Sequence, residues 1–159
     1  MSATREGAIV GIPTLGLDYA RAVAKAIGLP SYVALGNSRK FWYDDELAVP
    51  VESVTSPGTK KLLYIDPGLV GRVAGQRTIL IDDVINTGGT AAAIQLLRKV
   101  GAEVVALVVV LTEGHDWKAR LQAAEFDWAQ HVHRIGHIPL FQKTETGWVP
   151  IPETEDRHE

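Results

Sequence analysis

The amino-acid sequence predicts an α/β fold with a central, mostly parallel sheet flanked by helices. Short apolar runs at Ala8–Val10, Thr78–Ile81 and Val104–Leu111 are typical of buried strands. The first two runs are each followed by a glycine-containing turn and then by apolar residues at helical spacing. Because strand–helix–strand units are right-handed in nearly all folds, the strands that flank each helix are expected to lie parallel.

Composition and charge narrow the class of protein. The chain has 159 residues, of which 46% are hydrophobic, so a single domain spanning residues 1–159 is expected. It has no cysteine, which excludes disulfides and thiolate chemistry. The formal net charge of −3 and the scattered basic residues argue against a nucleic-acid partner. The polar start and the lack of an apolar run of about 18 residues argue against a membrane and predict a cytoplasmic protein.

The first strand, Ala8–Val10, leads through a turn at Gly11–Gly16 into a helix. Apolar residues on one face of residues 17–27 predict that helix, and a second strand is expected at Ser31–Leu35. The turn therefore lies at the carboxyl end of the first strand and faces the beginning of a helix. This position makes the turn a candidate anion site.

The parallel pattern is interrupted at residues 36–60, which are interpreted as a flexible lid. Val51–Thr55 and Lys60–Ile65 are expected to pair as a hairpin across Ser-Pro-Gly-Thr, a favourable turn sequence. A long hairpin next to an active site is typical of a lid that closes over a substrate. Phe41–Tyr43 are three consecutive aromatic residues, too many to share one buried face. This favours a contact with a partner subunit.

The second half continues with a helix at Ala91–Val100 and the strand Val104–Leu111, which is expected to be the most deeply buried strand of the sheet. Asp116 is expected to cap the next helix. Residues 115–152 are interpreted as a C-terminal helix and a hood, and residues 153–159 as a charged, mobile tail. Short strands are expected at Val132–Ile135, His137–Phe141 and Gly147–Pro150.

The chain is organised around residues 78–93, which read TILIDDVINTGGTAAA. A strand delivers Asp82 and Asp83 to the edge of the sheet, and a Thr-Gly-Gly-Thr loop precedes a helix. The backbone N–H groups of such a loop and the positive end of the helix dipole form a seat for a phosphate. Ionised carboxylates only accept hydrogen bonds, so the acidic pair suits sugar hydroxyls, or a divalent cation reached through water. The expected ligand is therefore a phosphorylated sugar.

This combination resembles the 5-phosphoribosyl-1-pyrophosphate (PRPP) binding signature of the type I phosphoribosyltransferases, with a layout nearest to the adenine and xanthine enzymes. The resemblance implies the type I phosphoribosyltransferase fold, with a hairpin lid and a small hood. It implies that Asp82 and Asp83 are the catalytic residues and bind the ribose hydroxyls. It assigns the 5′-phosphate to Asn86, Thr87, Gly88, Gly89 and Thr90, and the pyrophosphate to Thr14, Leu15, Gly16, Arg39 and Lys40.

The implied activity is transfer of ribose 5-phosphate from PRPP to a ring nitrogen of a nucleobase, with release of pyrophosphate. The implied cofactor is Mg²⁺, held through PRPP and water near the acidic pair rather than directly by the protein. The implied partners are PRPP, a nucleobase and a second copy of the chain. Purine salvage with adenine is the first expectation. Xanthine or orotate as the base, and a non-catalytic regulator that senses PRPP, are the alternatives.

Three positions depart from the patterns of the family and leave the base open. Asn86 stands three positions after the acidic pair, where hypoxanthine-guanine enzymes carry a third acidic residue. Ser56 stands where adenine enzymes commonly carry a glutamate, and Leu15 where many purine enzymes carry a basic residue. The first departure argues against the 6-oxopurines and the second against adenine. The third favours the regulator.

Two features of the C-terminal region are further candidates for ligand contacts. His131 and His133 alternate along a predicted strand, but no third ligand is evident, so a metal site there is disfavoured. Trp148 is a candidate for stacking on the base or for packing within the hood.

Overall fold

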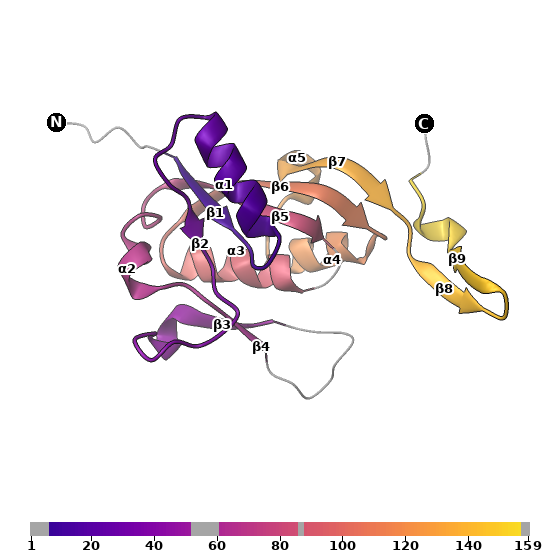
Figure 1. Ribbon diagram of the computed structural model, residues 1–159, viewed down its shortest axis with the longest axis horizontal. Coiled ribbons are helices and arrows are strands. Elements are labelled where there is room, and N and C mark those ends of the chain that lie inside the picture. The colour runs from indigo at the N-terminus through magenta and orange to yellow at the C-terminus, as the bar shows by residue number, and fades with distance from the viewer. Residues whose placement is uncertain (1–6, 52–60, 86–87, 157–159) are drawn as a thin grey trace.

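The computed structural model describes residues 7–51, 61–85 and 88–156, and these residues contain a five-stranded parallel sheet (Figure 1). The register of each neighbouring pair is parallel, as the sequence predicts. All five strands therefore end at one edge of the sheet. In spatial order they are β2 (Val33–Ala34), β1 (Ala8–Gly11), β5 (Arg77–Ile85), β6 (Glu103–Glu113) and β7 (Val132–Ile138).

Helices cover both faces of the sheet. Helix α1 (Gly16–Ala26) packs on β1 and β5, and α3 (Gly89–Lys99) packs on the opposite face (Figure 1). Two short helices, α4 (Asp116–Ala123) and α5 (Trp128–His131), follow β6 and lie on the side of α3. The expected α/β architecture with helices on both faces is confirmed.

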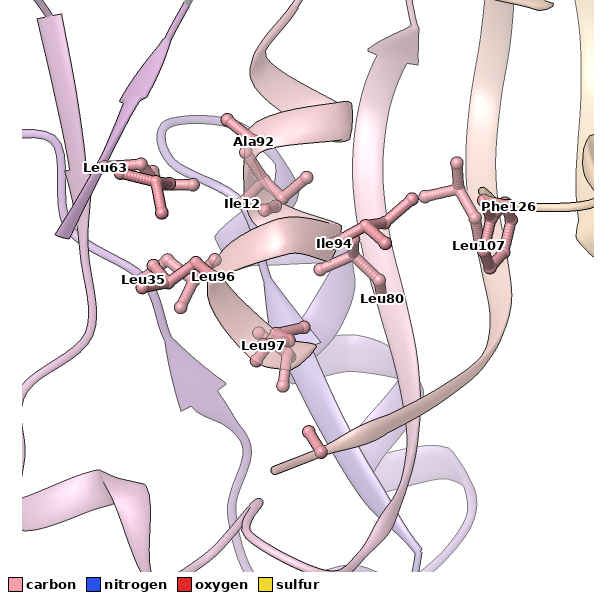
Figure 2. Close-up of a cluster of buried hydrophobic side chains, with 14 of the residues drawn as sticks. Ile12, Leu35, Leu63, Leu80, Ala92, Ile94, Leu96, Leu97, Leu107 and Phe126 are labelled. Carbon is pink, nitrogen blue, oxygen red and sulfur yellow. The ribbon is translucent and has the colours of Figure 1, made fainter. Parts of the chain in front are cut away.

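The hydrophobic core is divided between the two faces. Figure 2 shows the larger cluster, in which Leu80 of β5, Leu97 of α3 and Leu107 of β6 are fully buried. The smaller cluster joins Ala20 and Ala24 of α1 to the other face of β1 and β5. Each face thus fixes one of the helices that begin at the carboxyl edge.

The most buried strand is β5, which corrects the expectation that Val104–Leu111 lies deepest. In β6, Leu107 and Val109 are buried against the α3 side, but Val108 and Val110 are only half-buried. The reason is the position of α1, which packs mainly on β1 and β5 and covers β6 only in part, at Val108. An uninterrupted apolar run therefore does not prove burial on both faces.

The predicted hairpin is present but begins earlier in the chain than expected. Strand β3 (Ala48–Val51) pairs antiparallel with β4 (Lys61–Tyr64), and the pair packs against α3. Pro50 lies within β3, which a two-stranded ribbon tolerates because a proline can occupy an edge strand. The predicted lid stretch at Ser53–Ser56 lies outside the described residues. Beside the hairpin, η1 (Asp45–Leu47) precedes β3, and α2 (Pro67–Val70) follows β4.

The C-terminal region extends beyond the carboxyl edge of the sheet. Strand β7 is continuous across Gly136, where the sequence predicts a break, because this glycine leaves room for the side chain of Leu111 on β6. A hairpin of β8 (Phe141–Thr144) and β9 (Gly147–Pro150) follows and projects from the body (Figure 1).

Two expectations at the end of the chain are corrected. His115 rather than Asp116 occupies the cap position of α4, and Asp116 is the first residue of that helix. The start of the predicted tail is folded, because η2 (Pro152–Thr154) and Asp156 are tied to β7 by hydrogen bonds from His137 and Arg134. None of the helices in the described ranges is long and apolar enough to cross a membrane.

Candidate functional site

The acidic pair lies inside the central strand, near its carboxyl end. The sequence predicts that the strand ends at the pair, but the β-branched residues Val84 and Ile85 carry β5 two residues further. Asp82 is 7% exposed and lies on the face of α3. Side chains alternate along a strand, so Asp83 lies on the opposite face, where it is half-buried.

Both oxygens of Asp82 accept hydrogen bonds from the chain itself. Oδ1 accepts from the backbone N–H of Asp83 at 2.9 Å, and Oδ2 accepts from the hydroxyl of Thr90 at 3.2 Å. Thr90 is buried in the first turn of α3. The contact therefore ties the acidic pair to the beginning of the helix that follows the glycine loop.

The pKa of Asp82 is raised to about 8, chiefly because the carboxyl is buried. The neighbouring carboxyl of Asp83 raises this pKa further, whereas the hydrogen bonds from the Asp83 N–H and from Thr90 oppose the shift. Burial and a like charge both disfavour the ionised form. The surroundings of Asp82 thus favour its neutral form at neutral pH, and a ligand that brings a cation or hydrogen-bond donors would favour the ionised form.

The turn after β1 lies directly against the acidic pair. The backbone N–H of Ile12 donates to the carbonyl of Ile81 at 3.0 Å. A Cβ atom added to Gly16 would lie 2.9 Å from that carbonyl oxygen and 3.0 Å from the Cα of Asp82. Only glycine allows this approach. Thr14, whose peptide bond with Pro13 is cis, and Leu15 are exposed at the tip of the turn.

Helices α1 and α3, which begin at this edge, lack a side-chain cap, as does α4 after β6. Aspartates cap the short helices η1, α2 and α5 by accepting a hydrogen bond from a backbone N–H. Leu15 precedes α1 and Gly88 precedes α3 as the cap residue, and within the described part of the chain neither accepts such a bond. First-turn N–H groups without a side-chain partner are ready donors to an anion.

The structure brings together most, but not all, of the predicted site residues. Gly88, Gly89 and Thr90 open α3 next to Asp82, whereas Asn86 and Thr87 lie outside the described residues. Arg39, which the resemblance assigns to the pyrophosphate, is exposed and donates two hydrogen bonds to Asp45, at 2.8 and 3.2 Å. Asp45 raises the pKa of Arg39. Lys40 is exposed in the same segment.

The histidine pattern seen in the sequence does not form as expected. His131 is the last residue of α5 and His133 lies in β7, so the two do not alternate along one strand. Sequence reasoning instead missed a cluster of His115, His137 and Asp156, whose ligand atoms lie within 4.8 Å of one another. Its members come from three distant segments, and their spacing gives no signal. Trp148 is exposed on β9.

Comparison with known proteins identifies the family to which the chain belongs. The model of the phosphoribosyl transferase domain family matches residues 3–132. A hypoxanthine/guanine phosphoribosyltransferase of Methanococcus voltae is 34% identical over 115 residues, covering 72% of this chain and 56% of the relative. An adenine phosphoribosyltransferase of Kineococcus radiotolerans is 38% identical over 116 residues, covering 69% of this chain and 56% of the relative. The chain thus spans just over half the length of these curated relatives.

Solved structures agree on the fold. The adenine phosphoribosyltransferase of Thermoanaerobacter pseudethanolicus superposes with a TM-score of 0.65 at 18% identity, covering 86% of this chain and 73% of that one. The enzyme of Giardia lamblia, solved with 9-deazaadenine, gives the same TM-score and identity over 86% of this chain and 72% of that one. At this identity the likeness concerns the fold alone. Taken with the family match over residues 3–132, it places the chain in the phosphoribosyl transferase domain family, with the type I fold.

Proposed function

We propose that this chain is a Mg²⁺-dependent phosphoribosyltransferase of purine salvage, which transfers ribose 5-phosphate from PRPP to a ring nitrogen of a nucleobase and releases pyrophosphate. The observation that carries this proposal is the convergence of three segments at one edge. Gly16 contacts the backbone of Asp82, and Thr90 donates to its carboxylate. Ligands of open α/β sheets bind at this edge, between the loops that follow neighbouring strands.

The proposed roles follow from the chemistry that each segment offers. The residues Asn86–Thr90, which precede and open α3 in the sequence, bind the 5′-phosphate. The uncapped start of α1, at Thr14, Leu15 and Gly16, binds the pyrophosphate through backbone N–H groups. Asp82 and Asp83 accept hydrogen bonds from the ribose hydroxyls, and their negative charge stabilises the positive charge that develops on the ring when the bond at C1 breaks.

Thr90 has a second role in this proposal, since its hydroxyl fixes Asp82. Arg39 and Lys40 supply positive charge to the pyrophosphate, and Arg39 must first leave Asp45 to do so. An incoming nitrogen approaches C1 from the side opposite to the leaving pyrophosphate. The base therefore enters from the side of β6 and β7 rather than from that of β1.

The donor set of the site fits a magnesium ion. Carboxylate oxygens are the protein ligands that Mg²⁺ accepts, and a cation next to Asp82 would favour the ionised form that burial disfavours. When bound, Mg²⁺ neutralises charge on the pyrophosphate. In the proposal Asp82 and Asp83 hold the ion through water and PRPP.

Adenine is the proposed base, and the layout from Gly11 to Thr90 is the reason. The curated relatives divide between names for hypoxanthine/guanine and for adenine enzymes, so they support a purine without choosing one. Xanthine or orotate is the alternative base. A non-catalytic sensor of PRPP is the alternative function, which Leu15 favours because an exposed apolar side chain stands where a basic one would bind pyrophosphate.

Turnover with a panel of bases tests the proposal. The chain is incubated with PRPP, Mg²⁺ and either adenine, guanine, hypoxanthine, xanthine or orotate, and pyrophosphate release is followed. Release with adenine above the rate without base supports the proposal, and release with another base alone corrects the specificity. PRPP binding without turnover on any base would identify the sensor instead.

The proposal includes a homodimer in the cytoplasm. Phe41 is 91% exposed and Trp42 is half-exposed, so the aromatic segment of the monomer presents apolar surface next to the β3–β4 hairpin. A second copy of the chain would bury it. Sedimentation equilibrium, which measures the mass in solution, distinguishes a dimer from a monomer.

A further inference from the structure

The C-terminal segment folds back onto the carboxyl ends of β6 and β7 and is held there by polar side chains. Arg134 of β7 donates to Asp156 at 2.6 Å, and the backbone N–H of Leu140 donates to the hydroxyl of Thr154 at 2.8 Å. We call residues 151–156 the C-terminal strap. Two histidines, His115 and His137, lie between the strap and the sheet, and their rings are stacked 5.2 Å apart at 11°.

The tautomer of His137 follows from its partners. Its Nε2 lies 2.7 Å from the carbonyl oxygen of Thr154, and a carbonyl only accepts, so Nε2 carries the proton. Its Nδ1 therefore carries a lone pair. This nitrogen lies 2.9 Å from the hydroxyl oxygen of Thr112 and 3.8 Å from Oδ1 of Asp156. A histidine that donates one N–H to a backbone carbonyl and offers the other nitrogen is the usual arrangement of a metal ligand.

His115, whose ring is stacked on that of His137, has the same arrangement. Its Nε2 lies 3.4 Å from the carbonyl oxygen of Glu155, the next strap carbonyl after that of Thr154, so this nitrogen is again the donor. Its Nδ1 is buried and has no hydrogen-bond partner among the described residues. A buried polar atom without a partner is destabilising, so a ligand for this nitrogen would be stabilising.

Asp156 supplies a carboxylate whose orientation is already fixed. Its Oδ2 accepts from Arg134 at 2.6 Å, while Oδ1 faces Nδ1 of His137. The carboxylate is thus the anionic partner that two neutral imidazoles need in order to hold a dication.

We propose that His115, His137 and Asp156 form a site for a zinc-type divalent cation that fastens the C-terminal strap to the sheet. Two imidazoles and one carboxylate are a ligand set that Zn²⁺ accepts, whereas Mg²⁺ prefers oxygen ligands alone. A cavity of about 500 Å³ lined by Arg134, His137, Glu155 and Asp156 adjoins the cluster and admits the water that completes a tetrahedron. This site is separate from the proposed PRPP site.

Zinc binding requires a small movement of the three side chains. Ligand atoms in a tetrahedral zinc site lie about 3.4 Å apart, since each bond is about 2.1 Å long. One ligand atom from each of the three residues lies within 4.8 Å of the other two, so these atoms need to approach by up to about 1.4 Å. The hydroxyl of Thr112 turns away from His137 and continues to accept from Arg134, which lies 2.7 Å from it.

Zinc binding to the full chain tests the site without reference to catalysis. The protein is stripped of metal with a chelator and titrated with Zn²⁺ in a calorimeter, and Co²⁺ serves as the spectroscopic probe. We expect one Zn²⁺ per chain, a higher melting temperature with the ion, and cobalt absorption bands of a tetrahedral site. The substitution His115→Phe keeps the stacked ring and removes the nitrogens, so it should weaken binding at least about tenfold without unfolding the chain.

A matched control lies on the same strand. His133→Ala removes an exposed histidine of β7 that is not part of the cluster and should leave zinc affinity unchanged. Asp156→Asn should weaken binding as His115→Phe does. Absence of zinc binding by the wild-type chain, or equal affinity in the His115→Phe and Asp156→Asn variants, would overturn the proposal. So would loss of affinity in His133→Ala of the same size as in His115→Phe.

Discussion

Replacing Asp82 by asparagine is expected to abolish most of the activity and yet to stabilise the unliganded protein at neutral and alkaline pH. The amide occupies the same volume but cannot release a proton when PRPP and Mg²⁺ bind, so it provides no negative charge to stabilise the developing charge on the ribose. Loss of one such electrostatic contact costs on the order of 100-fold in rate. Pyrophosphate release in the presence of PRPP, Mg²⁺ and the accepted base measures this loss.

The effect on stability follows from the raised pKa of Asp82. Its pKa is about 8 in the folded chain and 3.8 for an aspartate exposed to water, so between these values the folded state holds a proton that the unfolded state has lost. The stability that the Asp82 carboxyl contributes therefore has its full value below pH 4 and declines as the pH rises towards 8. One proton is worth about 1.4 kcal/mol per pH unit, so this group contributes a decline of roughly 3 kcal/mol between pH 5 and pH 7.

Urea unfolding at several pH values compares the two proteins. Groups other than Asp82 contribute alike to both, so the difference between wild type and Asp82→Asn isolates this carboxyl. Asp83→Asn is the matched variant and should retain most of the decline, because burial is the largest cause of the shift. Parallel curves of stability against pH for wild type and Asp82→Asn would show that Asp82 is not protonated in the folded chain.

The second large effect is expected for Gly16→Ala. The added Cβ would lie 2.9 Å from the carbonyl oxygen of Ile81 and 3.0 Å from the Cα of Asp82, both backbone atoms of the central strand. Backbone atoms of this strand cannot yield, so the turn itself must move. Forcing one carbon into a packed contact costs about 1–3 kcal/mol. A displacement of about 1 Å at the pyrophosphate loop is expected to lower kcat/KM by about 100-fold.

Gly71→Ala is the control for this substitution. A Cβ at Gly71 meets nothing within 4 Å, and its φ of −61° suits any residue. We expect wild-type rates and equal or slightly higher stability for this variant. Stability from denaturant unfolding and kcat/KM from pyrophosphate release are measured for both. Wild-type behaviour of Gly16→Ala would mean that the turn does not need its contact with Asp82.

Local sequence patterns predict the parallel sheet and the segments of the site, because those segments are contiguous. Residues 78–93 carry strand, acidic pair, loop and helix in one stretch, so their spacing alone brings the acids next to the helix start. The face of the sheet on which each aspartate lies is harder to predict from the sequence. Asp82 bonds to Thr90 only because β5 continues to Ile85 and places Asp82 on the face of α3.

Features that depend on how distant elements pack could not be predicted in this way. Val108 and Val110 are half-buried because α1 covers only part of this face of the sheet. The sequence of β6 does not indicate where α1 lies. The contact of Gly16 with Asp82 and the cluster of His115, His137 and Asp156 each join segments far apart in the chain. The sequence of each segment alone does not indicate which distant residues it contacts.

Calorimetric titration of the wild-type chain with PRPP in the presence of Mg²⁺ tests the central claim most directly, since it requires no knowledge of the base. The account predicts one PRPP per chain, with binding strongly weakened when Asp82 and Asp83 are both replaced by asparagine in a chain that remains folded by circular dichroism. Undetectable binding to the wild type, or equal affinity in the double variant, would contradict it.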